Sequence, residues 1–255
     1  MLTTFTFHAS NFSNPLETIR KSHSYFGNIN KKETAKNVVL ISKNKKDVAN
    51  TLLSNFIVEH DNKEKKRGRK NREYVTVEEY LSRQFNLNRS KAKTWNGHGD
   101  RDLSQVIVQF GKAEDRLDRD KQLAALKQFG ADFCQFLGNT VVAAAIHMDE
   151  AAPHLQIDFL PVFKDKRGTP KVGISGFWAD RLQVKDNRQA FERLRIIAKN
   201  EANHCLKENY SDLRIERSKE LRLKELTEKI DRLEERGYEV ERARKTISRE
   251  ESIQR

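Results

Sequence analysis

The stretch from Val141 to Val162 reads VVAAAIHMDEAAPHLQIDFLPV and carries most of the information about the fold of this chain. The apolar run Val141–Ile146 has the length of a buried strand and is too short to span a membrane. The acidic, proline-containing segment Met148–Pro153 has the composition of a turn. His147 closes the first run and His154 opens the second, so the sequence predicts a hairpin with one histidine at the turn end of each strand.

The second strand of this hairpin is predicted to carry a polar face. Alternate side chains of a strand share a face, so His154, Gln156 and Asp158 should project together beside the histidine of the first strand. Two imidazoles and a side-chain oxygen can hold a divalent ion at about 2.0–2.2 Å from each ligand and leave room for a substrate oxygen. Asp149 and Glu150 in the turn are placed to orient ligands or move a proton. The alternative is a buried hairpin whose histidines are only hydrogen-bonded.

These residues match a known motif. The string HMDEAAPHLQ, from His147 to Gln156, resembles the H-x-D-E-x-x-P-H-x-H motif of the Mob/Pre plasmid mobilisation and recombination proteins, the MobV relaxases. Residues 28–30 (NIN), followed by Asn37, resemble the N-terminal asparagine motif of that family. The resemblance covers about residues 10–215.

The resemblance implies a histidine-hydrophobe-histidine endonuclease fold, in which a metal held by histidines polarises the scissile phosphate of single-stranded origin DNA. It implies that His147 and His154 are metal ligands and that Glu150 is an acid/base residue or an outer residue that orients them. The third ligand of the family is replaced by Gln156, whose neutral oxygen favours Mn²⁺ or Mg²⁺ as the divalent metal. Asp158 is a candidate to substitute for it or assist it.

The nucleophile is predicted from the same resemblance. Members of the family carry an N-terminal H-N-x-R motif whose histidine attacks phosphorus. His23 is the nearest equivalent, although neither the asparagine nor the arginine follows in register. Tyr25 is the second candidate and His8 the third; attack by imidazole leaves a phosphoramidate and attack by tyrosine a phosphotyrosine, and either bond allows the strand to be rejoined. The alternative is that His23 is a surface residue near a DNA groove.

The charge of the chain agrees with a nucleic-acid partner. Lys and Arg number 49 against 37 Asp and Glu, a net charge of +12 that attracts a polyanion. Residues 63–72 form a basic run that is predicted to be a flexible loop. A second basic segment, residues 164–170 (KDKRGTP), is predicted to be a hairpin tip. Either run is a solvated surface or a grip on phosphates. The candidate DNA contacts are Lys65, Lys66, Arg67, Arg69, Lys70, Arg72, Lys166 and Arg167, with Trp95 as a base-stacking residue and His98 as a possible further metal ligand.

The order of elements predicts an α+β fold, with an antiparallel or mixed sheet and helices packed on one face. Strands are expected at 37–42 and 103–110 besides the hairpin, and helices at 47–60, 75–85, 117–137 and 188–210. A relaxase domain is expected at 1–215, followed by a charged helical or coiled-coil-like tail at 216–255. The tail is either a homodimer contact or a lone solvated helix.

The remaining features indicate the compartment. Only two cysteines occur, far apart and in no metal-binding pattern, and no signal peptide or membrane-spanning run is present, so a cytoplasmic protein without membrane insertion is expected.

The predicted function is a metal-dependent relaxase that nicks and rejoins one strand of single-stranded or hairpin DNA at a plasmid or mobile-element transfer origin. The reaction would pass through a covalent protein–DNA intermediate. The alternatives are a rolling-circle replication initiator nuclease and a non-catalytic origin-binding protein, in which Gln156 marks a lost metal site.

Overall fold

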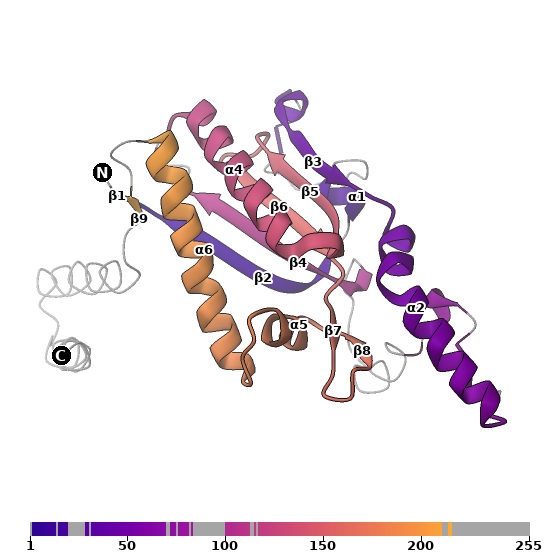
Figure 1. The fold of residues 1–255 in the computed structure, drawn as a ribbon. Coiled ribbons are helices and arrows are strands. Elements are labelled where there is room, and N and C mark those ends of the chain that lie inside the picture. The colour runs from indigo at the N-terminus through magenta and orange to yellow at the C-terminus, as the bar shows by residue number, and fades with distance from the viewer. Residues whose placement is uncertain are drawn as a thin grey trace, which may run out of the picture.

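An antiparallel sheet forms the centre of the molecule. The computed structural model describes residues 2–13, 15–19, 29–30, 32–69, 72–74, 76–81, 83, 100–112, 115, 117–210 and 214–215. The sheet has five strands in the order β2-β4-β6-β5-β3, and every neighbouring pair is antiparallel (Figure 1). The strands are β2 (Phe5–Ser13), β3 (Val38–Ser42), β4 (Asp100–Phe110), β5 (Val141–His147) and β6 (His154–Phe159). The predicted α+β fold is confirmed, and so is the hairpin of β5 and β6.

Helices cover one face of this sheet. α4 (Arg119–Leu137) and α6 (Asn187–Asn209) lie across it, and α5 (Ile174–Arg181) packs on α6 (Figure 1). Their apolar side chains join the alternate apolar residues of the strands in the main core. The short helix α1 (Pro15–Thr18) instead contacts β5 and β6, where it meets their polar side chains. The site described below therefore lies on the face away from α4 and α6.

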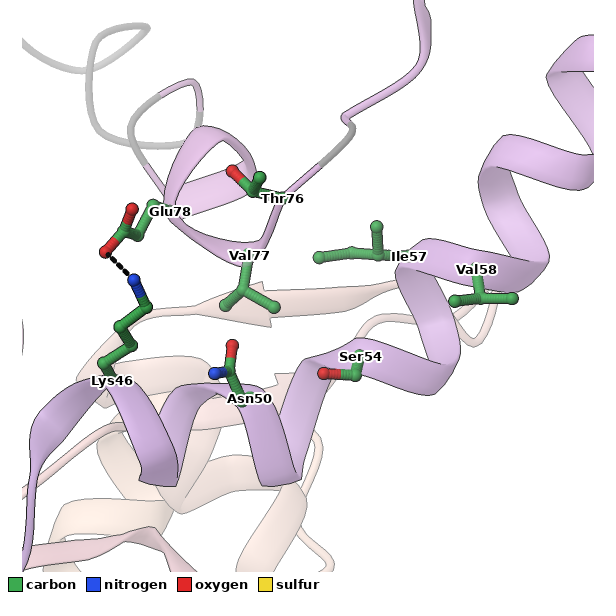
Figure 2. A pocket seen from close by; sticks show the side chains of 8 residues that line it. All are labelled: Lys46, Asn50, Ser54, Ile57, Val58, Thr76, Val77 and Glu78. Carbon is green, nitrogen blue, oxygen red and sulfur yellow. Dashed lines mark ion pairs between the residues drawn. The ribbon is translucent and has the colours of Figure 1, made fainter.

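A second, smaller core lies at one end of the sheet. α2 (Lys45–Lys66) and the helical residues 77–81 pack there against the strand-end residues Leu103, Val142 and Leu160. A cavity of about 380 Å³ lies between the two helical segments, with Val77 pointing into it (Figure 2). The predicted helix at 75–85 is observed at 77–81 and at Arg83, and positions 75, 82, 84 and 85 lie outside the described residues.

The basic run 63–72 is not a loop throughout, and this prediction was wrong. Its first residues form the last turn of α2, which ends at Lys66. Cations near a helix C-terminus interact favourably with the helix dipole, so a run of lysines prolongs this helix. Gly68 follows the C-cap residue Arg67 with a φ of 69°, a left-handed conformation that favours glycine and ends the helix.

Short elements complete the unit. The hairpin of β7 (Val162–Lys164) and β8 (Pro170–Val172) follows β6 and places the second basic segment at its tip, as predicted. β1 (Leu2–Thr3) pairs in parallel with β9 (Arg214–Ile215). Single 3-10 turns occur at η1 (Thr34–Lys36) and η4 (Gly138–Thr140).

The predicted tail at 216–255 lies outside the described residues. Within the described part of the chain, no helix has the length and apolar character needed to cross a membrane.

Candidate metal centre

The two hairpin histidines face each other on the polar side of the sheet. His147 and His154 are directly paired across β5 and β6, and opposite residues of an antiparallel pair point to the same face. Nδ1 of His147 lies 3.0 Å from Nε2 of His154, and the two rings are almost perpendicular, at 84°. His147 is only 1% exposed. The sequence-based expectation that these rings share a face therefore agrees with the geometry.

Backbone carbonyls determine which ring nitrogens carry protons. Nε2 of His147 lies 2.7 Å from the carbonyl oxygen of Thr18, and Nδ1 of His154 lies 3.3 Å from that of Ala152. A carbonyl oxygen only accepts, so each of these ring nitrogens is the N–H of its imidazole. The other two nitrogens, His147 Nδ1 and His154 Nε2, face each other at hydrogen-bond distance, so without an ion one of them donates a proton to the other. When neither carries that proton, both lone pairs point to one position between the rings, where a cation can be bound.

The donor set fits a divalent metal. Two imidazole nitrogens that each bind an ion at about 2.1 Å, at roughly a right angle, are about 3.0 Å apart. Glu150 adds a carboxylate: its Oε2 lies 3.9 Å from Nδ1 of His154, and one ligand atom from each of His147, Glu150 and His154 lies within 4.8 Å of the others. A carboxylate beside the second ring nitrogen of a metal-binding histidine fixes its tautomer and orientation.

Asn37 holds the turn that connects the two strands. Its Oδ1 accepts hydrogen bonds from the backbone N–H groups of Met148 (2.6 Å) and Asp149 (3.2 Å), and its Nδ2 donates to Asp149 Oδ2 (2.8 Å). Thr34 donates its hydroxyl to the same carboxylate oxygen. Asp149 is 1% exposed, and these donors supply hydrogen bonds that water would give an exposed carboxylate. One asparagine thus fixes the position from which Glu150 projects.

Arg119 and Asn30 hold the same turn from other directions. The guanidinium of Arg119, at the start of α4, donates to the carbonyl oxygens of Met148 and Glu150. The backbone N–H of Asn30 donates to the carbonyl oxygen of Asp149 at 2.7 Å. These hydrogen bonds restrict the backbone conformations that the turn can adopt.

Gln156 lies beside the histidine pair and is held by α1. Its Nε2 donates to Thr18 Oγ1 at 2.6 Å, and Thr18 is the residue whose carbonyl bonds His147. With its nitrogen engaged, the amide presents its oxygen as the group that can bind a metal. The assignment of Gln156 as a ligand stays a prediction.

Asp158 lies away from the histidine pair. It is four residues along β6 from His154, a distance of roughly 13 Å at the usual rise of a strand. It is fully buried, and its Oδ1 accepts from Gln105 Nε2 at 3.3 Å. The geometry therefore places Asp158 outside the cluster of His147, Glu150 and His154.

The candidate nucleophiles are placed only in part. His8 of β2 is exposed, and the strand register aligns it through Ile107 with Gln156 on the site face, about 10 Å from it at the usual strand spacing. His23 and Tyr25 lie outside the described residues, as do Trp95 and His98.

The predicted DNA contacts lie mostly on the surface. Lys65, Lys66, Arg67, Arg69, Arg72, Lys166 and Arg167 are exposed, whereas Lys70 lies outside the described residues. Two of these cations are paired with carboxylates: Lys65 lies 3.8 Å from Glu73, and Arg67 lies 3.1 Å from Glu64. They are therefore weaker candidates for phosphate contacts than the predicted cations that have no carboxylate within 4.0 Å in the described part of the chain.

Two residues of this site had no sequence signal. Thr18 is an ordinary threonine in a weakly patterned segment, and Arg119 begins a helix whose visible pattern is its apolar face. Both act through contacts to backbone or side chains distant in sequence, which periodicity does not report.

Replacing Asn37 with alanine is expected to weaken Mn²⁺ binding about 10–100-fold, the usual effect of losing a residue that orients metal ligands. The turn would lose three hydrogen bonds, and Glu150 would no longer be held beside His154. Titration of Mn²⁺ followed by electron paramagnetic resonance measures the affinity. The matched control is Asn55→Ala, which removes an exposed asparagine from α2; unchanged binding in Asn37→Ala would contradict the assigned role.

Comparison with known proteins gives a small set of similar structures. No family model and no curated protein matches the chain. One similar solved structure is the MobM relaxase domain (MOBV; Mob_Pre) bound to plasmid oriT DNA, Mn-bound at pH 6.8, with 13% identity and a TM-score of 0.43 over 78% of this chain and 85% of that chain. A Mn-bound form of the same domain at pH 4.6 has 13% identity and a TM-score of 0.42 over 84% and 92%. A structure described as the molecular basis of vancomycin resistance transfer in Staphylococcus aureus has 15% identity and a TM-score of 0.35 over 84% and 97%. The MobM domain belongs to the family that the hairpin motif of this chain resembles.

Proposed function

We propose that this chain is a metal-dependent relaxase, which nicks one DNA strand at the transfer origin of a plasmid or other mobile element and later rejoins it. The observation that carries the proposal is the facing pair of imidazole nitrogens, His147 Nδ1 and His154 Nε2, at 3.0 Å. Carbonyl partners on the opposite ring nitrogens orient the two rings, so that the facing nitrogens can bind one ion in place of the proton they share. The motif of the hairpin supports phosphodiester chemistry as the reaction.

The chain supplies ligands and their supports. His147 and His154 would hold Mn²⁺ or Mg²⁺, and Gln156 would add its amide oxygen as a third ligand. Such an ion, when bound, withdraws charge from the scissile phosphate. The carboxylate of Glu150, 3.9 Å from His154 Nδ1, favours a proton on that nitrogen by its charge, so that Nε2 stays a ligand, and Glu150 is the carboxylate that we propose accepts a proton from the attacking group.

His23 is the nucleophile that we propose, with Tyr25 as the second candidate and His8 as the third. The described residues on both sides of the His23 segment contact the site: Thr18 bonds His147, and Asn30 bonds Asp149. The segment that contains His23 is therefore joined at both ends to residues that contact the hairpin of β5 and β6. Attack by an imidazole nitrogen on phosphorus releases the 3′ hydroxyl and leaves a phosphoramidate, and the reverse attack by that hydroxyl rejoins the strand.

The catalytic unit is proposed to span 1–215, and the helical tail at 216–255 is proposed either to pair with a second copy in a homodimer or to be a lone solvated helix. The net charge of +12 supports binding to single-stranded or hairpin origin DNA. A site of action in the cytoplasm follows from a DNA substrate.

The test is a nicking assay with the full chain. A supercoiled plasmid carrying the DNA that flanks the coding sequence of this chain is incubated with Mn²⁺, with Mg²⁺ or with a chelator. Open circles are expected with either metal and not with the chelator. Mass spectrometry of the nuclease-trimmed adduct then locates the nucleotide on the chain, with His23→Gln and Tyr25→Phe as paired variants.

Three outcomes separate the possibilities. An adduct on His23 supports the proposal in full, whereas an adduct on Tyr25 or His8 keeps the relaxase and moves the nucleophile. Binding of the DNA without any nicking, in both metals, would support a non-catalytic origin-binding protein instead.

A further inference from the structure

A further cavity, different from the one in Figure 2, lies far from the hairpin of β5 and β6 that carries the two histidines. A cavity of about 330 Å³ opens where the last turns of α2 meet the β7–β8 hairpin. His154 opens β6, and the β7–β8 hairpin follows the opposite end of that strand. Since a six-residue strand is about 20 Å long, this hollow and the histidine pair lie at different ends of the sheet. We call it the aromatic pocket, after the rings of Phe56, His60, Tyr74 and Tyr80 that line it.

The rings of the aromatic pocket form one connected cluster. The ring centroids of His60 and Tyr74 are 4.8 Å apart, those of Tyr74 and Tyr80 are 4.9 Å apart and perpendicular at 89°, and those of Phe56 and Tyr80 are 5.6 Å apart. Asp61 fixes two of them, because its Oδ1 accepts from the backbone N–H of Tyr74 at 3.0 Å and lies 3.1 Å from His60 Nδ1. The buried hydroxyl of Tyr80 donates to the carbonyl oxygen of Pro170. The cluster is therefore held in place before any ligand arrives.

Cations from two distant segments surround these rings. Lys63 comes from α2, whereas Arg167 and Lys171 come from the β7–β8 hairpin. Among the described residues, no ion pair within 4.0 Å engages any of the three. The one carboxylate in the lining is that of Glu59, and Asp165 nearby accepts from the backbone N–H groups of Arg167 and Thr169. The two basic segments of the sequence thus converge on a single aromatic hollow.

We propose that the aromatic pocket binds an unpaired nucleotide of a DNA strand, with the base against the rings and the neighbouring phosphates on Lys63, Arg167 and Lys171. Every base has a face that stacks on aromatic side chains, and cations beside such rings follow the phosphates; this combination is how proteins bind single strands without reading sequence. In a duplex the base faces are covered by their neighbours, so the pocket selects single strands. The inference rests on the proposed function only for the choice of DNA as the polymer.

Binding is tested with the full chain in a chelator, so that no nicking takes place. A fluorescent dT oligonucleotide measures affinity as a function of salt, and the same oligonucleotide with one 2-aminopurine measures stacking through quenching of its fluorescence. For single strands, each phosphate contact contributes about 0.7 to the slope of log affinity against log salt. Arg167→Gln combined with Lys171→Gln should therefore lower the slope by about 1.4. Tyr74→Leu should lower affinity roughly 10-fold and remove part of the quenching, whereas Tyr74→Phe should keep both.

The matched control is Lys127→Gln combined with Arg195→Gln, which removes the same two charges from exposed positions of α4 and α6. This control should bind with the slope of the unmodified chain. If the pocket and control variants change the slope equally, or if a duplex of the same length quenches 2-aminopurine as a single strand does, the proposal is overturned. A chain that binds dT in this way but never nicks plasmid DNA would overturn the proposed function and leave the pocket standing. A chain that nicks plasmid DNA while its pocket variants bind dT normally would overturn the role of the pocket and leave the proposed function standing.

Discussion

Replacing His154 with alanine should reduce metal-dependent nicking at least about 100-fold, beyond the 10–100-fold that follows from loss of a residue that only orients a ligand. The change removes Nε2, one of the two nitrogens that face each other at 3.0 Å. It also leaves the lone pair of His147 without a second ligand to share an ion. The rate of open-circle formation in Mn²⁺ measures the effect.

Metal binding by the same variant separates a lost ligand from a lost fold. An ion that binds the folded chain at 100 times its dissociation constant raises the free energy of unfolding by about 2.7 kcal/mol. Mn²⁺ should stabilise the unmodified chain in this way and should not stabilise His154→Ala. The control is His204→Ala, which removes an exposed histidine of α6 that lies 3.5 Å from Glu208. If His154→Ala keeps both Mn²⁺ stabilisation and nicking, the histidine pair is not the metal centre.

Replacing Phe129 with alanine should lower the free energy of unfolding by about 3–5 kcal/mol. Phe129 is fully buried on α4, and its ring stacks on Phe133 at 5.4 Å and meets Phe110 edge-on at 6.2 Å. Alanine would leave a cavity between the helix layer and the sheet, because neighbouring side chains close such a space only in part. Urea unfolding followed by circular dichroism measures the difference.

An exposed residue provides the comparison for this core substitution. Ile196 of α6 is 60% exposed, so Ile196→Ala should change the free energy of unfolding by no more than about 0.5 kcal/mol. A loss below 1 kcal/mol in Phe129→Ala would mean that α4 is not packed on the sheet as described.

The strands and helices with one apolar face were predictable from sequence. β5 and β6 were recognised from a continuous apolar run and an alternating one, and α4 and α6 from apolar residues at helical spacing. These patterns report which side of an element is buried, and in this fold most elements are buried on one side, between the sheet and one layer of helices. β2 was not predicted, although Phe5, Phe7 and Ala9 alternate with threonine, histidine and serine, which is the pattern of a half-buried strand.

The site was predictable only where its residues are close in sequence. His147, Glu150 and His154 lie within one hairpin, so the turn itself brings them together. The contact of Thr18 with His147 spans 129 positions, and that of Asn37 with Met148 spans 111, and no local pattern reports such distances. Asp158 is close in sequence but not in space to the site. Alternation placed it on the correct face of β6, but it lies four residues along the strand from His154 and therefore too far away to share an ion.

The parallel pairing of β1 with β9 makes the described unit nearly circular, because Leu2 and Thr3 lie beside Arg214 and Ile215. A short linker could therefore join these positions directly, and new ends could be opened at the exposed tip of the β7–β8 hairpin, near Gly168. Such a circular permutant would keep the order of strands in the sheet. It would also move any attached label or fusion partner from one corner of the molecule to another while the histidine hairpin stays uninterrupted.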